Sequence, residues 1–448
     1  MQDRGLTEFK SFTGHLQAGG DIMPITFLTL IDMSGEVKFD FSAIALTKET
    51  SFIMKYWDGE GSRPGYFSLS GKAEDGTEFK TEDLHFISLS TESNEETGSR
   101  MIPIGGCLRA EFRRKLATPT PKPLLRMYIK GFQNFGQLSS TCCLGRVEMD
   151  GYKTIEDPDF ITGYITIQSD NEPIGLAVWH AEADKLLEHI RRLMSFASGV
   201  MLLSPIIKFY SGDHLEVIAL SQSRQASAHS STFHYLNQQP IFDAAVASFY
   251  NPPFEIKNLF FAIEWFAMES SYNEIRLINA MTALENLIAS NLENNDKFIQ
   301  SEKEFEKTRR KLRTVIRQCI EKWQTDDSNT ISEIVKELNE KLADLNRRSI
   351  RQKLSILVGH WQIPLDGIDE DKIKAAITAR NLIVHRGHYY DADKESSGDD
   401  LWDHATVVRE IVVRFILTAI GYRGDYISYV GGYHYAQFPP QSDVSDAN

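Results

Sequence analysis

The hydrophobic residues change their spacing partway along the sequence, and this change constrains the fold more than any other feature. In the first third, short segments rich in β-branched and aromatic residues alternate apolar and polar positions, with turn residues between them. After Phe254, apolar residues recur every three or four positions, as on one face of an α-helix. The sequence therefore predicts an α+β chain, with a β-rich region followed by an all-α region.

The β-rich region is expected to form a sandwich or a barrel-like sheet. Its predicted strands are 26–33, 36–46, 50–57, 66–73, 86–91, 107–112, 124–132, 144–149 and 160–168. The segment 88–99 is predicted to end in a polar loop, and the proline-rich segment 117–123 is a predicted loop. Near the end of the region we expect an amphipathic helix, followed by a hairpin of strands 206–212 and 215–221.

The all-α region has strong helical periodicity. The predicted helices are 258–271, 274–290, 297–323, 369–387 and 406–422, with two shorter helices between the third and the fourth. Residues 222–233 form a connector, and Asn251-Pro252-Pro253 marks the boundary. The predicted domains are therefore a β-rich sensor or regulatory domain at 1–240, an all-α domain at 250–435, and a disordered tail at 436–448.

Composition indicates a protein of the cytoplasm. The chain has 448 residues, which suits two or three domains, and its net charge of −14 argues against coating nucleic acid over its whole surface. Its four cysteines have no framework spacing, which is typical of reduced thiols. The first residues lack the apolar core of a signal peptide, and no apolar run reaches the roughly 18 residues that a membrane span needs.

One segment of the all-α region contains candidate catalytic residues, namely RNLIVH at 380–385. Asn381 and His385 are four residues apart and share a helix face, and the long side chain of Arg380 can reach that face. An imidazole transfers protons near neutral pH, and a guanidinium binds phosphate and stabilises developing negative charge. These groups suit metal-free cleavage of RNA, in which the 2′-hydroxyl attacks the adjacent phosphate.

Such a reaction uses a base and an acid, whereas this helix face offers one histidine. A two-fold dimer would bring two histidines and two arginines into one cleft. We therefore expect a homodimer with a composite site. Its interface is expected to use the apolar residues of this helix and of the next one, namely Ile383, Val384, Val407, Ile411 and Phe415.

The string resembles the R-N-x-x-x-H motif of HEPN-domain ribonucleases and lies, as in that family, on a late helix of an all-α domain. Segment 274–290 resembles the early HEPN helix, with Glu285 at its polar position. A β-rich region before a HEPN unit is similar to the ApeA-type proteins of bacterial anti-phage abortive infection. The resemblance implies a metal-independent endoribonuclease without cofactors. It also implies catalytic Arg380, Asn381 and His385, and a sensing domain for an unknown phage-derived or cellular trigger.

A group of basic residues supports RNA as the partner. They lie on the long helix after residue 300 and in the segment that follows the next helix: Arg309, Arg310, Lys311, Arg313, Arg347 and Arg348. A basic surface beside the motif would concentrate phosphate locally. Because glutamates such as Glu302, Glu304 and Glu306 are interspersed, an ordinary solvated helix face remains an open alternative.

Three further patterns have simpler interpretations. Arg224 and His229 repeat the Arg-to-His spacing in the connector without the asparagine, which favours chance. A metal site could use His385, His388, Asp391, Asp393 and His404, but no H-E-x-x-H pair exists, and a polar loop is the simpler interpretation. Cys142-Cys143 could be a redox pair, although buried structural cysteines are commoner.

At the level of function, the alternative is a non-catalytic HEPN-like protein that dimerises or binds RNA or another partner.

Overall fold

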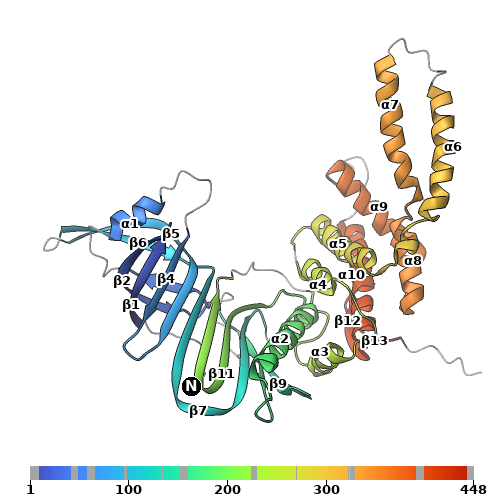
Figure 1. Ribbon diagram of the computed structural model, residues 1–448. Coiled ribbons are helices and arrows are strands. Elements are labelled where there is room, and N and C mark those ends of the chain that lie inside the picture. Colours follow the sequence, from blue (N-terminus) through green and yellow to red (C-terminus); the bar gives the residue numbers. More distant parts are fainter. Residues whose placement is uncertain are drawn as a thin grey trace, which may run out of the picture. The chain divides into compact units, whose positions relative to one another are not determined.

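The computed structural model describes residues 10–41, 49–57, 66–94, 98–132, 136–151, 160–222, 230–268, 270–320, 322, 328–389 and 398–440. The chain divides into two compact units, Met1–Asn251 and Pro252–Asn448. The first unit contains a large antiparallel sheet with helices, and the second is mainly helical (Figure 1). The predicted α+β class is therefore confirmed.

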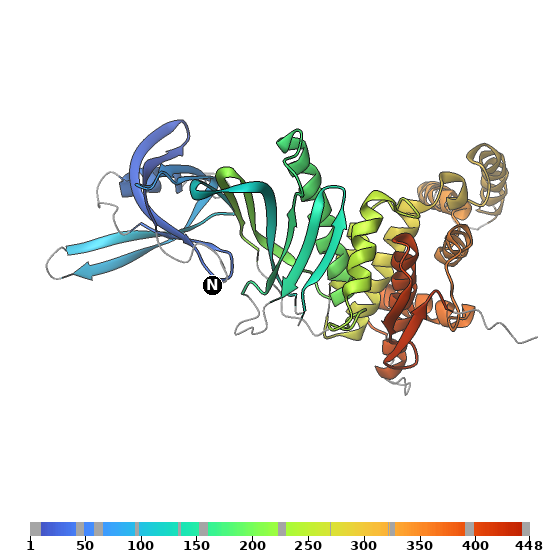
Figure 2. The same cartoon turned by 90° about the horizontal axis from the view of Figure 1, so that it is seen from below.

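In the described part of the first unit, eleven strands form one sheet. Its order is β3-β2-β1-β4-β5-β7-β10-β9-β8, with β11 also beside β7 and β6 beside β5. The strands are β1 Lys10–Ala18, β2 Asp21–Ile31, β3 Val37–Asp40, β4 Phe67–Lys72, β5 Glu78–Asn94, β6 Gly98–Gly106, β7 Arg109–Lys130, β8 Leu138–Cys142, β9 Gly145–Gly151, β10 Gly163–Gln168 and β11 Leu203–Leu220. The paired strands β5 and β6 extend from the sheet as a two-stranded ribbon (Figure 2).

Strands β7 and β11 pair along their length and join two halves of the sheet. The first part of β7 also pairs with β5 and the last part with β10. Between these parts, Pro119, Pro121 and Pro123 cannot donate to a ladder, and the register shifts around Gly212 of β11. The predicted loop 117–123 and the predicted hairpin 206–221 are therefore wrong. Each segment continues through an irregularity of one long strand, because the partner strand continues beside it.

Aromatic residues fill the core of the first half. Phe12 stacks on Phe27 with ring centroids 5.4 Å apart, and both rings also contact Phe79. Segment 50–57, predicted as a strand, is instead the helix α1 Glu49–Trp57. Phe52 and Tyr56, four residues apart, place their rings together at a centroid distance of 5.2 Å and against Phe67. The segment forms a helix although its residue types favour strands, because helical spacing brings these two side chains together.

Two helices pack against the second half of the first unit. The predicted amphipathic helix is α2 Leu176–Ser198, which contacts β7 and β10 and buries Leu186, Ile190 and Leu193. It ends at Gly199, whose φ of 67° suits glycine. Helix α3 Gln239–Tyr250, which has no counterpart among the predicted elements, packs against α2 and β8.

The second unit consists of helices and one short hairpin of strands. Its elements are α4 Leu259–Ala267, α5 Asn273–Asn291, η1 Asn294–Lys297, α6 Glu302–Ile320, α7 Ser328–Lys341, η2 Leu342–Asn346, α8 Ile350–Trp361, α9 Glu370–Arg386, α10 Gly398–Ala419, β12 Gly424–Ser428 and β13 His434–Phe438. Helices α6 and α7 extend from the other helices as an antiparallel pair, the α6–α7 arm (Figure 1). In the described part of the chain, no helix has an apolar stretch long enough to cross a membrane.

Helix α10 lies at the centre of this unit and contacts α4, α5 and α9. Val407, Ile411 and Phe415 are buried in this core. Their predicted role in a dimer interface is therefore wrong, since neighbouring helices of the same chain already cover them. Residues 436–438, assigned by sequence to a disordered tail, belong to β13, while 441–448 lie outside the described residues.

Candidate functional site

The helix that carries the motif has well-defined ends. The Oδ1 of Asp369 accepts a hydrogen bond from the backbone N–H of Lys372 at 2.8 Å and caps the first turn of α9. Gly387, with φ of 80°, ends the helix, and its N–H donates to the carbonyl of Ile383 at 2.8 Å. Ile373, Ala376 and Ala379 are buried, and the helix packs on α10 and α5. The opposite face of α9 is left to solvent.

The guanidinium of Arg380 lies between two oxygen acceptors. Its Nη2 donates to Oε1 of Glu285 on α5 at 2.7 Å, and its Nη1 donates to Oδ1 of Asn381 at 3.1 Å. The side chain of Arg380 retains 29% of its exposure. The structure thus brings Glu285 to the motif and fixes the plane of the guanidinium while part of it still faces solvent.

His385 and Asn381 are both exposed on the outer face of α9, one helical turn apart. Among the described residues, His385 has no hydrogen-bond partner, so its two ring nitrogens are open to a substrate. The site therefore combines a fixed planar donor with an accessible proton-transfer group. One protomer supplies one such imidazole on this face.

The described members of the alternative metal-binding set, His385, His388 and His404, do not form a metal site. His404 lies with its Nε2 3.4 Å from the hydroxyl of Tyr389. Asp391 and Asp393 lie outside the described residues. Within the ranges that the structure describes, no group of three His, Cys, Asp or Glu side chains could hold a metal ion.

The predicted RNA-binding residues belong mainly to the α6–α7 arm. Helix α6 packs on α7 and η2, whereas α9 packs on α10 and α5, so the packing does not join the basic residues to the motif. Arg310, Lys311 and Arg347 are exposed, whereas Arg309, Arg313 and Arg348 are half-buried. Arg309 and Arg310 both pair with Glu306. The arm therefore offers a mixed-charge surface with a few exposed cations.

The structure describes one of the two remaining sequence patterns, the adjacent cysteines. Cys142 is half-buried at the end of β8 and Cys143 is exposed in the turn before β9, so Cys143 is not a buried structural cysteine. Both are free thiols. Arg224 and His229 lie outside the described residues.

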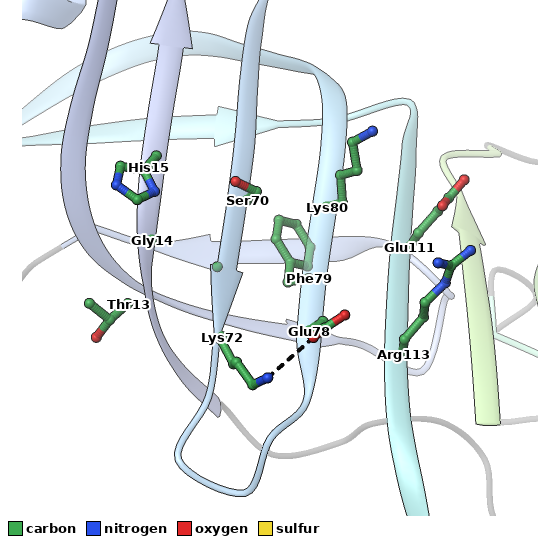
Figure 3. Close-up of a pocket in the computed structure, with 11 residues that line it drawn as sticks. Thr13, Gly14, His15, Ser70, Lys72, Glu78, Phe79, Lys80, Glu111 and Arg113 are labelled. Carbon is green, nitrogen blue, oxygen red and sulfur yellow. Dashed lines mark hydrogen bonds and ion pairs between the residues drawn. The ribbon is translucent and has the colours of Figure 1, made fainter. Parts of the chain in front are cut away.

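A concave surface on the sheet of the first unit was not predicted from sequence. This cavity of about 440 Å³ lies over β1, β4, β5 and β7. His15, Ser70 and Lys80 come from neighbouring strands and line it side by side (Figure 3). Most of its charges are already paired: Lys72 with Glu78 at 3.2 Å, Lys80 with Glu82, and Arg113 with Glu216. These residues occupy alternate positions on adjacent strands, so they share one face of the sheet. The sequence alone does not show that they meet there, because the register between the strands is not known from it.

No protein-family model, curated protein or solved structure matches the chain. Its candidate function therefore depends on the residues and the geometry described above.

Proposed function

We propose that this protein is a metal-independent endoribonuclease of the HEPN type. One observation carries the proposal: Arg380 is held by Glu285 and Asn381 on the exposed face of α9 that also presents His385. A fixed guanidinium suits a phosphate that gains charge in the transition state. An unpaired imidazole suits proton transfer at neutral pH.

In the proposed reaction the 2′-oxygen of one ribose forms a new bond to the adjacent phosphorus, and the bond from phosphorus to the 5′-oxygen breaks. One imidazole accepts the proton of the 2′-hydroxyl, and a second imidazole donates a proton to the departing 5′-oxygen. Arg380 stabilises the negative charge on the non-bridging oxygens. The products are a 2′,3′-cyclic phosphate and a 5′-hydroxyl, so no metal-bound water is required.

Because the face of α9 provides one imidazole, the proposed active species is a homodimer in which each protomer contributes His385. Apolar side chains suitable for an interface are exposed on α4 and at the start of α5: Phe261, Trp265, Met268, Tyr272 and Ile275. Val384 is also exposed, on α9 close to the motif. Exposed apolar groups of this extent are typical of protein–protein contacts.

For the β-rich unit we propose a sensing and regulatory role in bacterial anti-phage defence, acting in the cytoplasm. A nuclease that kills its host cell must be held inactive until a trigger arrives. The cavity lined by His15, Ser70 and Lys80 is a concave feature of this unit suited to receive such a trigger. Its paired charges favour a polar ligand that exchanges hydrogen bonds with them.

The second candidate is a non-catalytic protein that dimerises or binds RNA or another partner. The exposed apolar residues of α4 and α5 favour it, since an interface alone would explain them. In that case the ion pair of Arg380 and Glu285 only joins two helices. A part-exposed pair of this kind contributes about 0–1 kcal/mol to stability.

Cleavage of RNA by the purified full-length protein in EDTA distinguishes these candidates. Wild-type protein is compared with His385→Ala and with His360→Ala, an exposed histidine elsewhere in the same unit. The nuclease proposal expects cleavage in EDTA that leaves 5′-hydroxyl ends, is abolished by His385→Ala and persists in His360→Ala. Loss of wild-type cleavage in EDTA would indicate a metal nuclease, and absence of cleavage with retained self-association would support the binding protein.

A further inference from the structure

The two helices of the α6–α7 arm distribute their charges differently. Taken together they have mixed charge, but one face of α6 carries only basic and uncharged residues. Because successive residues of an α-helix turn by about 100°, these residues fall within a sector of about 120°, which we call the outer face of α6. Its residues, all of them exposed, are Lys303, Lys307, Arg310, Lys311, Thr314, Arg317 and Gln318.

The outer face lies opposite the side on which α6 packs. Phe305, Leu312 and Ile316 are half-buried on that other side, and α6 contacts α7 there. The basic side chains therefore point away from α7 and into solvent. From Lys303 to Arg317 they follow about 21 Å of the helix axis. This basic line belongs to a chain whose net charge is −14.

The acidic residues of α6 lie beyond the edges of the outer face. Glu302, Glu304 and Glu306 all fall outside the sector. Glu304 accepts a hydrogen bond from the hydroxyl of Ser301 at 2.8 Å, and Glu306 pairs with Arg310 at 3.4 Å. These two carboxylates are therefore already engaged at the edges and do not neutralise the lysines between them.

The lysines of the outer face remain available. Among the described residues, Lys303, Lys307 and Lys311 make no ion pair or hydrogen bond. The arm contains no histidine between residues 302 and 341, so its charge does not depend on histidine protonation. The acidic residues of the connection between the two helices, Glu321, Asp326 and Asp327, lie outside the described residues.

Helix α7 provides an internal comparison. Its exposed charged residues are three glutamates and two lysines, which alternate along the helix: Glu333, Lys336, Glu337, Glu340 and Lys341. Lys341 pairs with Glu337 at 2.7 Å. The exposed side of α7 is therefore an ordinary solvated face, whereas the outer face of α6 has charge of one sign.

The composition of the outer face favours phosphate groups as its partner. It has no apolar or aromatic residue, and Val315, which is 53% exposed, lies outside the sector. A helix that binds a membrane surface has an apolar face, and a protein interface depends on aromatic or apolar anchors. The phosphate backbone of a nucleic acid binds to lysine and arginine without such anchors.

We propose that the outer face of α6 binds the phosphate backbone of single-stranded RNA, whatever its base sequence. Lys303, Lys307 and Lys311 make the principal contacts. The choice of RNA rests on the proposed function. Since α6 packs on α7 and η2 and not on α9, this surface holds the RNA outside the motif. It differs from the set predicted from sequence, in which Arg309 and Arg313 are half-buried.

Fluorescence anisotropy with two labelled single-stranded RNAs of unrelated sequence tests the proposal. The full-length protein carries His385→Ala in every sample, so that the RNA stays intact. In this background, Lys307→Gln with Lys311→Gln is compared with Lys336→Gln with Lys341→Gln, which removes the same charge from α7. All four lysines are exposed, so the fold should persist.

The α6 pair should raise the Kd about tenfold at 0.1 M salt for both RNAs. It should also reduce the slope of log affinity against log salt by about 1.4, since each lost phosphate contact contributes about 0.7 for single strands. The α7 pair should bind as the parent protein does. Lys307→Arg with Lys311→Arg keeps the charge and should also bind as the parent does, which separates loss of charge from damage to the helix.

Equal losses in the α6 and α7 pairs, unchanged binding by the α6 pair, or a loss confined to one RNA sequence would overturn the proposal. Binding of anionic phospholipid vesicles without binding of RNA would also overturn it. The result is independent of cleavage. RNA that binds through α6 but is not cut by the wild-type protein would contradict only the proposed function, and cutting without a contribution from α6 would contradict only this surface.

Discussion

The Nη2 of Arg380 on α9 lies 2.7 Å from Oε1 of Glu285 on α5, a residue 95 positions earlier in the chain. The pair is part-exposed, so its contribution to stability is small. Its effect on orientation is larger, since it fixes the plane of the guanidinium together with Asn381. The pair therefore allows the proposed catalytic role of Arg380 to be separated by experiment from a structural role.

Glu285→Ala should lower the rate of RNA cleavage by about 10- to 100-fold, because a guanidinium released from its partner no longer keeps its position. The free energy of unfolding should change by about 1 kcal/mol or less. Single-turnover kinetics and denaturant unfolding measure the two effects. Glu293→Ala, at an exposed glutamate after α5, is the matched control. A Glu285→Ala protein with the wild-type rate would show that Glu285 does not position Arg380.

Arg380→Lys keeps the positive charge and loses the planar group that bridges Glu285 and Asn381. RNA binding should persist, while the cleavage step should lose about 2–4 kcal/mol of transition-state stabilisation. Filter binding and single-turnover cleavage separate these quantities. If the Arg380→Lys variant cleaves RNA as fast as wild type, Arg380 contributes only its positive charge and not the planar geometry of its guanidinium.

Phe261→Ser removes an exposed apolar group from α4, where the side chain is 56% exposed. We expect the variant to shift from dimer to monomer in light scattering and to lose cleavage, because the proposed cleft uses one imidazole from each protomer. Ile22→Ser, at a comparably exposed apolar residue of the other unit, should leave both properties unchanged. A wild-type protein that is fully active as a monomer would refute the composite site.

Stability of the first unit should fall as the pH decreases from about 6.5 to 4. Burial between α2 and α3, with a smaller effect of Arg192, lowers the pKa of His189 to about 4. Since the unfolded chain then binds a proton that the folded chain does not, unfolding becomes easier over this range, by about 3 kcal/mol in total. Denaturant unfolding of wild type and His189→Gln at several pH values isolates this residue. Parallel curves for the two proteins would show that His189 has the same pKa in the folded and the unfolded chain, and would contradict the prediction.

Sequence patterns identified most helices of the second unit, because apolar residues recur along them with helical spacing. They also placed Asn381 and His385 on one face of α9, which needs only the geometry of a helix. The predictions from sequence failed where contacts between residues far apart in the chain determine the structure. The prolines of 117–123 indicate a loop when the sequence is considered alone, because only the structure shows that β11 pairs with this segment. The sequence of α10 likewise does not show which neighbouring helices cover its apolar sides. The contact of Arg380 with Glu285 has no spacing rule, because it joins two helices far apart in sequence.

Strands β7 and β11 belong to both halves of the sheet, so neither half is a removable module. Cutting the chain between the halves would divide both strands and leave each half with open edges along its longest ladder. Transfer of this sheet to another protein would therefore have to include both strands whole, and insertions would be tolerated at the turns of this sheet but not along these two strands. Cooperativity follows from the same arrangement, since loss of pairing in one half frays the strands on which the other half depends.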